Sequence, residues 1–318
     1  MAGRLRIAES LKRVVLLGSS RGKASVGWTM AILATVAFST VPPVARAAIV
    51  SGMSPTTLLA ARYSIAIVLL GSTLRFTTTG NLRVDRRGLL IAGAVGSLHG
   101  VATLTFFLAL NRITASVASI LVSIYPLVVL GLLALRGENF TYRHLIRLTI
   151  GLGGVYLLIG HTGQVDGLGA LLVLVAAVTY AIHLVLVQWF LGDYGVRAVA
   201  TYIAAGMTVI VVGTWLAQGA EWHDPGWQGW LAIGLLAVVG TYLAHLAMLS
   251  GVRGIGSGQT ALLAPLETLL AVLWSILLLQ ERLTLPQWLG GSLIVLSALL
   301  AVRRLRRPPW NWRVWLRS

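Results

Sequence analysis

Long apolar stretches dominate this sequence and leave one class of fold open to it. A helix needs about 20 mostly apolar residues to cross a bilayer. Only 11% of the 318 residues are charged, whereas a soluble domain carries roughly 25%. We therefore predict an all-α membrane protein with ten transmembrane helices, and we exclude soluble, disordered and collagen-like chains. The ten stretches lie near residues 25–49, 56–74, 88–110, 113–135, 143–160, 167–190, 197–217, 228–249, 256–279 and 285–302.

The basic residues indicate how the chain is oriented. A net charge of +16 would suggest nucleic acid as the partner of a soluble protein. Here 21 of the 25 Lys and Arg residues fall on one side if both termini are cytoplasmic, which leaves Arg46, Arg62, Arg112 and Arg282 on the other. This distribution is the positive-inside bias. We expect a multi-pass protein of the plasma (inner) membrane with both termini cytoplasmic and no nucleic-acid partner.

The two halves of the chain resemble each other. A shift of 142 residues places Phe38 on Tyr180 and Thr103 on His245. Each half then contains five spans, and because five is odd, the second half enters the membrane from the opposite side. Inverted repeats of this kind occur in many secondary transporters, with the substrate bound between the repeats near the bilayer midplane.

The predicted organisation has four parts. A basic cytoplasmic tail over 1–24 precedes the first five-helix repeat, 25–160, and the second repeat spans 167–302. A basic, Trp-rich tail over 303–318 follows, a composition that favours the interface with anionic lipids. The sequence Ala45-Arg46-Ala47 is similar to a signal-peptide cleavage site. We expect the first helix to be retained because it has a counterpart in the second half.

Motifs at matching places in the two halves point to a known family. The fourth span of each half begins with small residues, has a proline or an acid near its middle and ends in a Gly-Glu-Arg-Leu-like sequence. Over residues 25–302 the chain resembles the EamA family of the drug/metabolite transporter superfamily. The motifs are residues 109–116 (ALNRITAS), Pro126 and Gly137-Glu138 in the first half, and residues 254–257 (GIGS), Glu267-Thr268 and 280–283 (QERL) in the second.

The resemblance implies translocation of a substrate, commonly the export of amino acids or related metabolites. It also implies a central cavity lined by the third, fourth, eighth and ninth helices together with the first and sixth. The family often has Glu-Pro where this chain has Glu267-Thr268, and the nearby proline is Pro265. We therefore expect the kink of the ninth helix to be displaced by most of a turn.

Glu267 is the one acid that the sequence places deep within a span. It shares a helix face with Ser257, Thr260 and Ala264, a small and polar stripe in apolar surroundings. Intramembrane acids are costly and usually face a cavity or a partner. Two interpretations stay open: a structural hydrogen-bonded carboxylate, or a cavity carboxylate that binds a substrate ammonium or a coupling proton.

The fourth helix carries a similar stripe of Ser116, Ser119, Ser123 and Pro126, and Tyr125 is the repeat counterpart of Glu267. Small residues of this kind serve close helix packing, and hydroxyl groups can also satisfy the carbonyl that a proline frees. The same positions can line a pocket. Both roles remain open for Ser119, Ser123 and Tyr125.

Three histidines lie within spans: His99, His183 and His245. A zinc site needs three or four convergent ligands, and the spacing offers no such motif, so we expect neither a metal nor a cofactor. Each histidine is either a neutral ring bonded to a neighbouring hydroxyl or a group that handles protons or contacts substrate.

The first helix carries Pro42-Pro43, which should kink it two-thirds of the way across, either for packing or for a gate. Arg46 and Arg62 are expected to reach lipid headgroups, with contact to a substrate carboxylate as the alternative.

The predicted function is that of a secondary transporter, not an enzyme, whose partners are a small-molecule substrate, membrane lipids and, if transport is coupled to them, protons. The alternatives are an intramembrane enzyme acting on a lipid or small molecule, and transport of a nucleobase, sugar or drug. Candidate cavity residues are Glu267, Tyr125, His99, Thr103, His245, Ser119, Ser123, Phe38, Tyr180, His183 and Thr260, and the candidate kink residues are Pro42, Pro43, Pro126 and Pro265.

Overall fold

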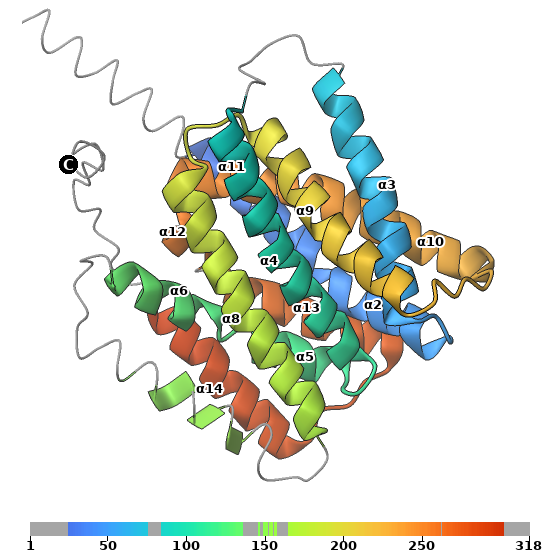
Figure 1. The fold of residues 1–318 in the computed structure, drawn as a ribbon. Coiled ribbons are helices and arrows are strands. Elements are labelled where there is room, and N and C mark those ends of the chain that lie inside the picture. Colours follow the sequence, from blue (N-terminus) through green and yellow to red (C-terminus); the bar gives the residue numbers. More distant parts are fainter. Residues whose placement is uncertain are drawn as a thin grey trace, which may run out of the picture.

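The chain folds into a bundle of membrane-length helices (Figure 1). The computed structural model describes residues 25–75, 84–135, 146, 149–151, 153–154, 156–157, 165–261 and 263–301. In the first half it has a helix over 25–39, α2 (Val41–Val50), α3 (Pro55–Arg75), α4 (Arg86–Leu110), α5 (Ala115–Val122) and α6 (Tyr125–Ala134). In the second half it has α8 (Gly167–Phe190), α9 (Val196–Ala217), α10 (Gly226–Ala237), η1 (Val238–Leu243), α11 (Ala244–Ile255), α12 (Ser257–Ala261), α13 (Ala264–Leu279) and α14 (Leu285–Ala301).

Eight helical stretches within the described residues are long and apolar enough to cross a membrane. They match eight of the ten predicted spans. Helix α14 covers most of the tenth span, and the fifth, 143–160, lies largely outside the described residues, as do the two terminal tails. Large apolar side chains such as Val68, Leu90 and Val209 are exposed on the outer faces of these helices. That arrangement suits a lipid environment, where apolar surface need not be buried.

Three of the spans that the structure describes are broken, and each break lies just before a proline. Thr40 separates the helix over 25–39 from α2, which begins with Val41-Pro42-Pro43. Pro126 and Pro265 each occupy the second position of α6 and α13. A proline lacks the N–H that a helix interior needs, but it fits the first turn. With the 142-residue shift, Pro265 falls three residues before Pro126, so the second break is displaced by most of a turn.

The third span of the second repeat contains a π-helical turn, η1, between α10 and α11. Its counterpart in the first repeat, α4, is an unbroken α-helix of 25 residues. A π turn inserts one extra residue into the helix and often marks a functional position. The two spans differ in conformation although the sequence relates them.

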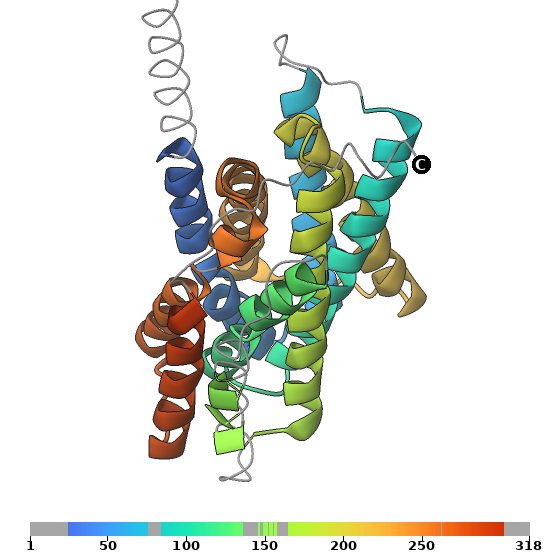
Figure 2. The same cartoon turned by 90° about the vertical axis from the view of Figure 1, so that its left-hand side faces the viewer.

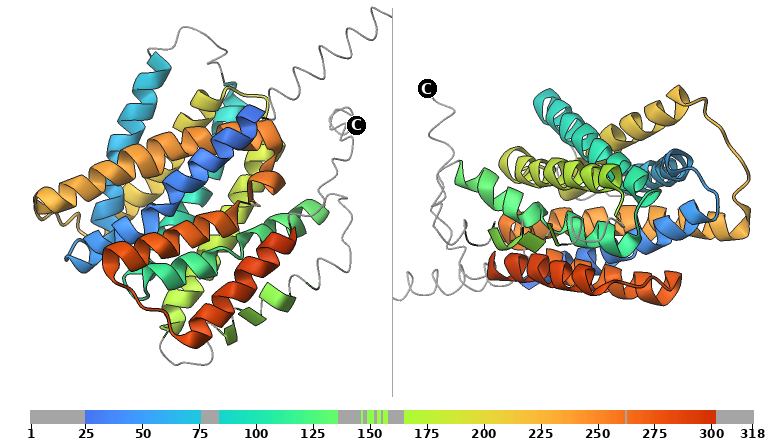
Figure 3. Two further views of the ribbon diagram at one scale, coloured as in Figure 1. Left: turned by 180° about the vertical axis from the view of Figure 1, so that it is seen from behind. Right: turned by 90° about the horizontal axis from the view of Figure 1, so that it is seen from below.

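Helix α4 packs closely on α8 and α9, which run beside it in Figure 1. A Cβ atom added to Gly96 would lie 2.2 Å from the carbonyl oxygen of Ile203, and one added to Gly206 would lie 2.3 Å from that of Gly93. Glycine is therefore required where α4 and α9 touch. The helix over 25–39 similarly lies beside α11 (Figure 2), and α14 lies on the face away from α4 and α9 (Figure 3).

Polar contacts tie the helix ends together. At one end of the bundle, Arg112 and Asp166 form an ion pair of 3.0 Å between nitrogen and oxygen. At the other end, the Tyr194 hydroxyl donates to Asp85, which caps α4 by accepting from the Gly88 amide. The hydrogen bond from Tyr194 and that from the Gly88 amide both lower the pKa of Asp85 below its ordinary value.

The two ends of the ninth span are also held. Beyond the end of α13, the Glu281 carboxylate accepts from the backbone amides of Ala115 and Ser116 and from the Ser116 hydroxyl, at 2.6–2.9 Å. Glu281 thereby caps α5 of the first repeat. At the start of α12, the side-chain oxygen of Gln188 accepts from the amide and the hydroxyl of Ser257.

Candidate functional site

A cavity of about 120 Å³ lies at the centre of the bundle, where the broken spans meet. By the same measure one water molecule needs roughly 10–15 Å³, so the space is large enough for several waters or a small metabolite. Its walls come from the six spans expected from the family resemblance, the first, third, fourth, sixth, eighth and ninth, and also from α3 of the second span.

The structure brings nine of the eleven candidate residues into the wall of this cavity and leaves two outside. His183 lies behind the wall with its Nδ1 3.2 Å from the Val95 carbonyl oxygen. Thr260 donates its hydroxyl to the Gly256 carbonyl within its own helix turn. The nine that line the cavity are Phe38, His99, Thr103, Ser119, Ser123, Tyr125, Tyr180, His245 and Glu267, together with the kink residue Pro42.

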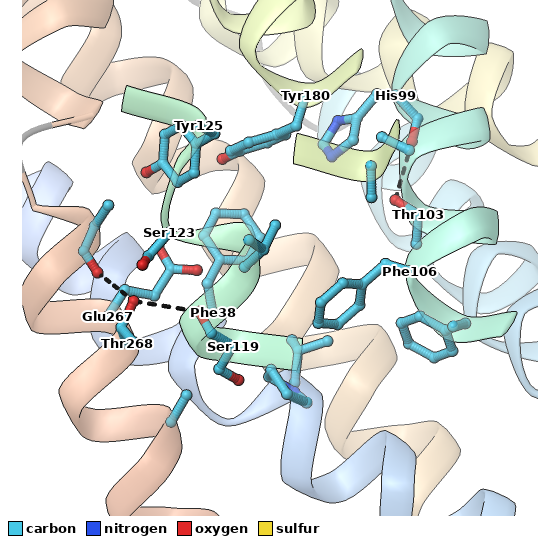
Figure 4. A pocket seen from close by; sticks show the side chains of 18 of the residues that line it. Phe38, His99, Thr103, Phe106, Ser119, Ser123, Tyr125, Tyr180, Glu267 and Thr268 are labelled. Carbon is cyan, nitrogen blue, oxygen red and sulfur yellow. Dashed lines mark hydrogen bonds between the residues drawn. The ribbon is translucent and has the colours of Figure 1, made fainter. Parts of the chain in front are cut away.

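Glu267 occupies the first turn of α13, directly after the break in the ninth span. Its side chain is half-buried and lines the cavity, and among the described residues its carboxylate has no hydrogen-bond partner. Acidic groups are stabilised in the first turn of a helix by the N-terminal end of the helix dipole. In Figure 4, Glu267 lies on the same side of the cavity as Ser123 and Tyr125, and His99 and Thr103 lie on the opposite side. The carboxylate is therefore open to a ligand.

Aromatic rings form much of the remaining wall. Tyr125 and Tyr180, from opposite repeats, make an edge-to-face contact with ring centroids 5.0 Å apart. Phe38 makes a similar contact with His245 at 5.5 Å. Edge-to-face contact is a favoured geometry for aromatic pairs, so these rings support one another. The surface that they present suits an apolar or aromatic group.

The three histidines meet at the back of the cavity although they come from three helices. The His99 ring lies 4.2 Å from the His183 ring and 5.2 Å from the His245 ring, measured between centroids. Each is buried and has a fully buried ring nitrogen without a hydrogen-bond partner among the described residues: Nδ1 of His99 and Nε2 of the other two. The described part of the chain holds no group of His, Asp and Glu residues arranged for a metal ion.

Two of the three serines in the fourth span, Ser119 and Ser123, bond to their own helix. The Ser119 hydroxyl donates to the Ala115 carbonyl at 2.7 Å, and the Ser123 hydroxyl donates to the Ile120 carbonyl at 2.6 Å. Neither reaches the Val122 carbonyl, four residues before Pro126, for which the sequence suggested them as donors. Both still face the cavity.

Arg62 does not lie where the first interpretation of the sequence placed it. Expected at lipid headgroups, it is instead only 2% exposed, and it lines the cavity. Its Nε donates to the Thr241 hydroxyl at 2.6 Å and its Nη2 to the Gly240 carbonyl at 2.8 Å, both in the π turn η1. An isolated arginine within a span is costly, by about 2.5–3.5 kcal/mol on insertion scales when it lies at the centre. A compensating interaction is therefore required.

Arg46 also differs from expectation. It is half-buried and its Nη1 donates to the Leu110 carbonyl at the end of α4. This contact joins the end of the first span to the end of the third. The position in the second half that corresponds to Arg46, 142 residues later, is Gln188. Its side chain also bonds to the backbone at a helix end, because it accepts from the Ser257 amide at the start of α12. The paired positions support the internal relation between the two halves.

Comparison with known proteins agrees with this architecture. The chain is 28% identical over 230 residues to "Uncharacterized inner membrane transporter YicL" of Salmonella typhimurium, covering 71% of this chain and 76% of that protein. It is 27% identical to "Uncharacterized transporter YcbK" of Bacillus subtilis, covering 63% of this chain and 68% of that protein. "Uncharacterized inner membrane transporter YedA" of Escherichia coli K12 is 26% identical, with 67% and 71% covered.

A solved structure described only as "Crystal structure of protein" has the same fold. It superposes with a TM-score of 0.63 at 18% identity, covering 89% of this chain and 98% of the other. The EamA-like transporter family matches the chain twice, over residues 25–160 and 167–303. Together with the membrane-length helices and the central cavity, these two matches show that the chain is a multi-pass membrane transporter and belongs to the EamA-like transporter family.

Proposed function

We propose that this transporter exports amino acids or related small metabolites by alternating access. The observation that carries the proposal is the central cavity. There the carboxylate of Glu267, which has no hydrogen-bond partner among the described residues, stands among the aromatic rings of Phe38, Tyr125 and Tyr180. A carboxylate within the membrane-spanning part of a protein usually faces a partner, and a substrate ammonium group or a proton can be that partner. The rings provide the apolar surface that surrounds most bound metabolites.

The proposed arrangement is a pair of inverted five-helix repeats in the plasma membrane, with both termini in the cytoplasm. Contacts between linkers support it. Asp85 precedes the third span and Tyr194 precedes the seventh, and the two residues are bonded at one end of the bundle. Arg112 follows the third span and Asp166 precedes the sixth, at the opposite end. If ten spans cross the membrane in alternating directions, the linkers that carry Asp85 and Tyr194 lie on one side of the membrane and those that carry Arg112 and Asp166 lie on the other.

The two halves give the cavity different groups. The second repeat supplies the acid, Glu267, and the first supplies the hydroxyl-bearing face of Ser119 and Ser123. The half-helices α6 and α13 both start at the cavity, which is the usual place for binding sites in transporters with broken helices. Rocking of one repeat against the other would expose the cavity to each side of the membrane in turn.

The direct test is transport by the purified protein in proteoliposomes. Uptake of radiolabelled amino acids, nucleobases and sugars is measured with and without an imposed pH gradient. We expect amino acids to be taken up and the other two classes not. If only a nucleobase or a sugar is taken up, amino acids are rejected as the substrate class in favour of that compound's class. Uptake that depends on the pH gradient would identify protons as the coupling ion.

Glu267→Gln tests the carboxylate because it keeps the size of the side chain and removes its charge. We expect transport to fall by about 10- to 100-fold, the effect of losing a hydrogen bond to a charged group, or to lose its pH dependence. Glu221→Gln is the matched control, since Glu221 is exposed in the linker after α9.

The melting temperature of both variants should stay near that of the wild type. If Glu267→Gln transports normally, Glu267 has no part in binding. If it loses folded protein, the carboxylate is a structural group, as the other interpretation of the sequence has it.

A further inference from the structure

We propose that the free Nη1 group of Arg62 binds a carboxylate of the molecule that enters the central cavity. The inference rests on the proposed function in one respect only, because it takes this cavity as the substrate site. It assigns a second charged pole to the cavity, in the second span, at a residue that neither the repeat nor the family motifs single out.

The hydrogen bonds of Arg62 leave one side of its guanidinium group unused. A guanidinium has five N–H donors in one plane. Nε gives its hydrogen to the Thr241 hydroxyl, and Nη2 gives one to the Gly240 carbonyl. Nη1 is buried and has no hydrogen-bond partner among the described residues. One N–H of Nη1 and the second N–H of Nη2 point in the same direction and form the free end of the fork.

The group is also held in place before any ligand arrives. The Arg62 guanidinium carbon lies 5.2 Å from the ring centroid of Tyr63 and 5.4 Å from that of Phe107, within the range of cation–π contacts. The Tyr63 and Phe107 side chains are themselves about 1% exposed. An arginine fixed by two hydrogen bonds and two rings loses little freedom when it binds a ligand.

The chemistry of the site favours a carboxylate over other anions. Among the described residues that line the cavity, Arg62 is the one Lys or Arg, so the site has a single full positive charge. Within the described parts of the chain it has no ion-pair partner. A planar carboxylate matches the free end of a guanidinium with two parallel hydrogen bonds, whereas a phosphate dianion would need a second cation. With Glu267 in the same cavity, a zwitterion satisfies both poles.

A purely structural role for Arg62 explains the positions of Nε and Nη2 but not that of Nη1. Holding the π turn requires only Nε and Nη2, and that role leaves Nη1 without a partner. Here Nη1 lies in the interior of the bundle, where an unpaired polar group is unfavourable. A ligand carboxylate supplies the missing acceptor and the missing negative charge together.

The test compares benzoate with benzamide, which have the same ring and nearly the same shape but differ in charge. Dissociation constants are measured by calorimetry on the full-length protein in nanodiscs. We expect the wild type to bind benzoate about 10- to 100-fold more tightly than benzamide. Arg62→Gln should abolish this preference, and Arg62→Lys, which keeps the charge without the fork, should reduce it.

Arg253→Gln is the matched control, because Arg253 is exposed in the last turn of α11, and it should keep the preference. The proposal is overturned if the wild type binds both compounds equally, or if Arg62→Gln still prefers benzoate. If Arg62→Gln does not fold, the wild-type comparison and Arg62→Lys decide the matter, and an unchanged preference in Arg62→Lys rejects the fork.

Amino-acid transport is measured on the same purified proteins reconstituted into proteoliposomes, so that the two proposals can fail separately. Preference for benzoate without amino-acid transport supports the Arg62 site and overturns the proposed substrate. Amino-acid transport without preference for benzoate overturns the Arg62 site and leaves the proposed function standing.

Discussion

The third span of the first repeat and its counterpart in the second have taken different conformations. Helix α4 is continuous, is capped by Asp85 at its start and packs through Gly96 against the backbone of α9. The counterpart begins without a side-chain cap at Pro225, opens into the π turn η1 and continues as α11. Helix α4 packs closely on its neighbour, whereas the π turn of the other span presents a backbone carbonyl to the side chain of Arg62.

The difference shows where the asymmetry of the cavity arises. The π turn offers the Gly240 carbonyl and the Thr241 hydroxyl to Arg62. In the other repeat, the position that the 142-residue shift relates to Arg62 is Ala204, which is fully buried. A duplicated fold can thus keep its helices and still place a cation on one side only. The packing of α4 and the polar opening of η1 can be tested separately.

The largest effect on stability is expected from Gly96→Ala, which disrupts the close packing of α4 on α9. The added methyl group would meet the Ile203 backbone at 2.2 Å, and backbone atoms cannot move aside as a side chain can. We expect a loss of about 3 kcal/mol in the free energy of unfolding, the upper end of the usual cost of overpacking. Denaturant titration in detergent measures it.

Gly93→Ala is the control on the same helix, because a Cβ atom there meets nothing within 4 Å. It should leave stability unchanged or raise it slightly, since alanine favours helix over glycine. Equal effects of the two substitutions would show that α4 and α9 are not in close contact.

A smaller effect is expected from Thr241→Val, which attacks the π turn. The Thr241 hydroxyl donates to the Leu236 carbonyl and accepts from Arg62, so its loss leaves a buried donor without a partner. We expect a cost of about 2 kcal/mol, within the range for an unsatisfied buried group. The measurement is again the free energy of unfolding.

Thr105→Val in α4 is the comparison, because its hydroxyl bonds only to carbonyl groups of its own helix. Those carbonyls keep their backbone bonds, so a change close to zero is expected. A Thr241→Val variant as stable as Thr105→Val would mean that Arg62 does not depend on η1.

The smallest effect concerns the capped start of α4. The pKa of Asp85 is lowered by the Tyr194 hydroxyl and the Gly88 amide. The stabilisation is therefore fully present above the ordinary pKa of an aspartic acid and is lost as pH falls through the lowered value. We expect Tyr194→Phe to lower the melting temperature slightly at pH 7, and this deficit should shrink as the pH is lowered and Asp85 becomes protonated. A deficit that does not change with pH would point to lost packing of the ring instead.

Much of the fold follows from the sequence alone. Apolar length predicts the spans, because a lipid-crossing helix must bond all its backbone groups internally. The prolines predict where spans break, and the altered position of Pro265 predicts the displaced second break. The cavity residues Ser119, Ser123 and Glu267 can be found because each lies on a polar face of an otherwise apolar helix. These signals are local in the chain.

The remaining features depend on contacts between distant residues. Arg62 lies near the end of an apolar stretch, where an arginine ordinarily reaches the headgroups, and its partners in η1 are almost 180 residues away. The sequence Val238–Leu243 carries no local sign of a π turn. The sequence places His99 and His183 within spans, but it cannot show that the two rings, from different repeats, lie 4.2 Å apart.

The capping of α5 by Glu281 has a mechanical consequence. The link joins the end of α13 in one repeat to the start of α5 in the other through three hydrogen bonds to a carboxylate, roughly twice as strong as neutral ones. At the opposite end of the same span, Ser257 is held by the neutral amide of Gln188. Separating Glu281 from α5 therefore costs more free energy than separating Gln188 from Ser257. If the helices move during transport, α5 and α13 would move together, with the chain bending at the breaks at Ser123 and Leu263.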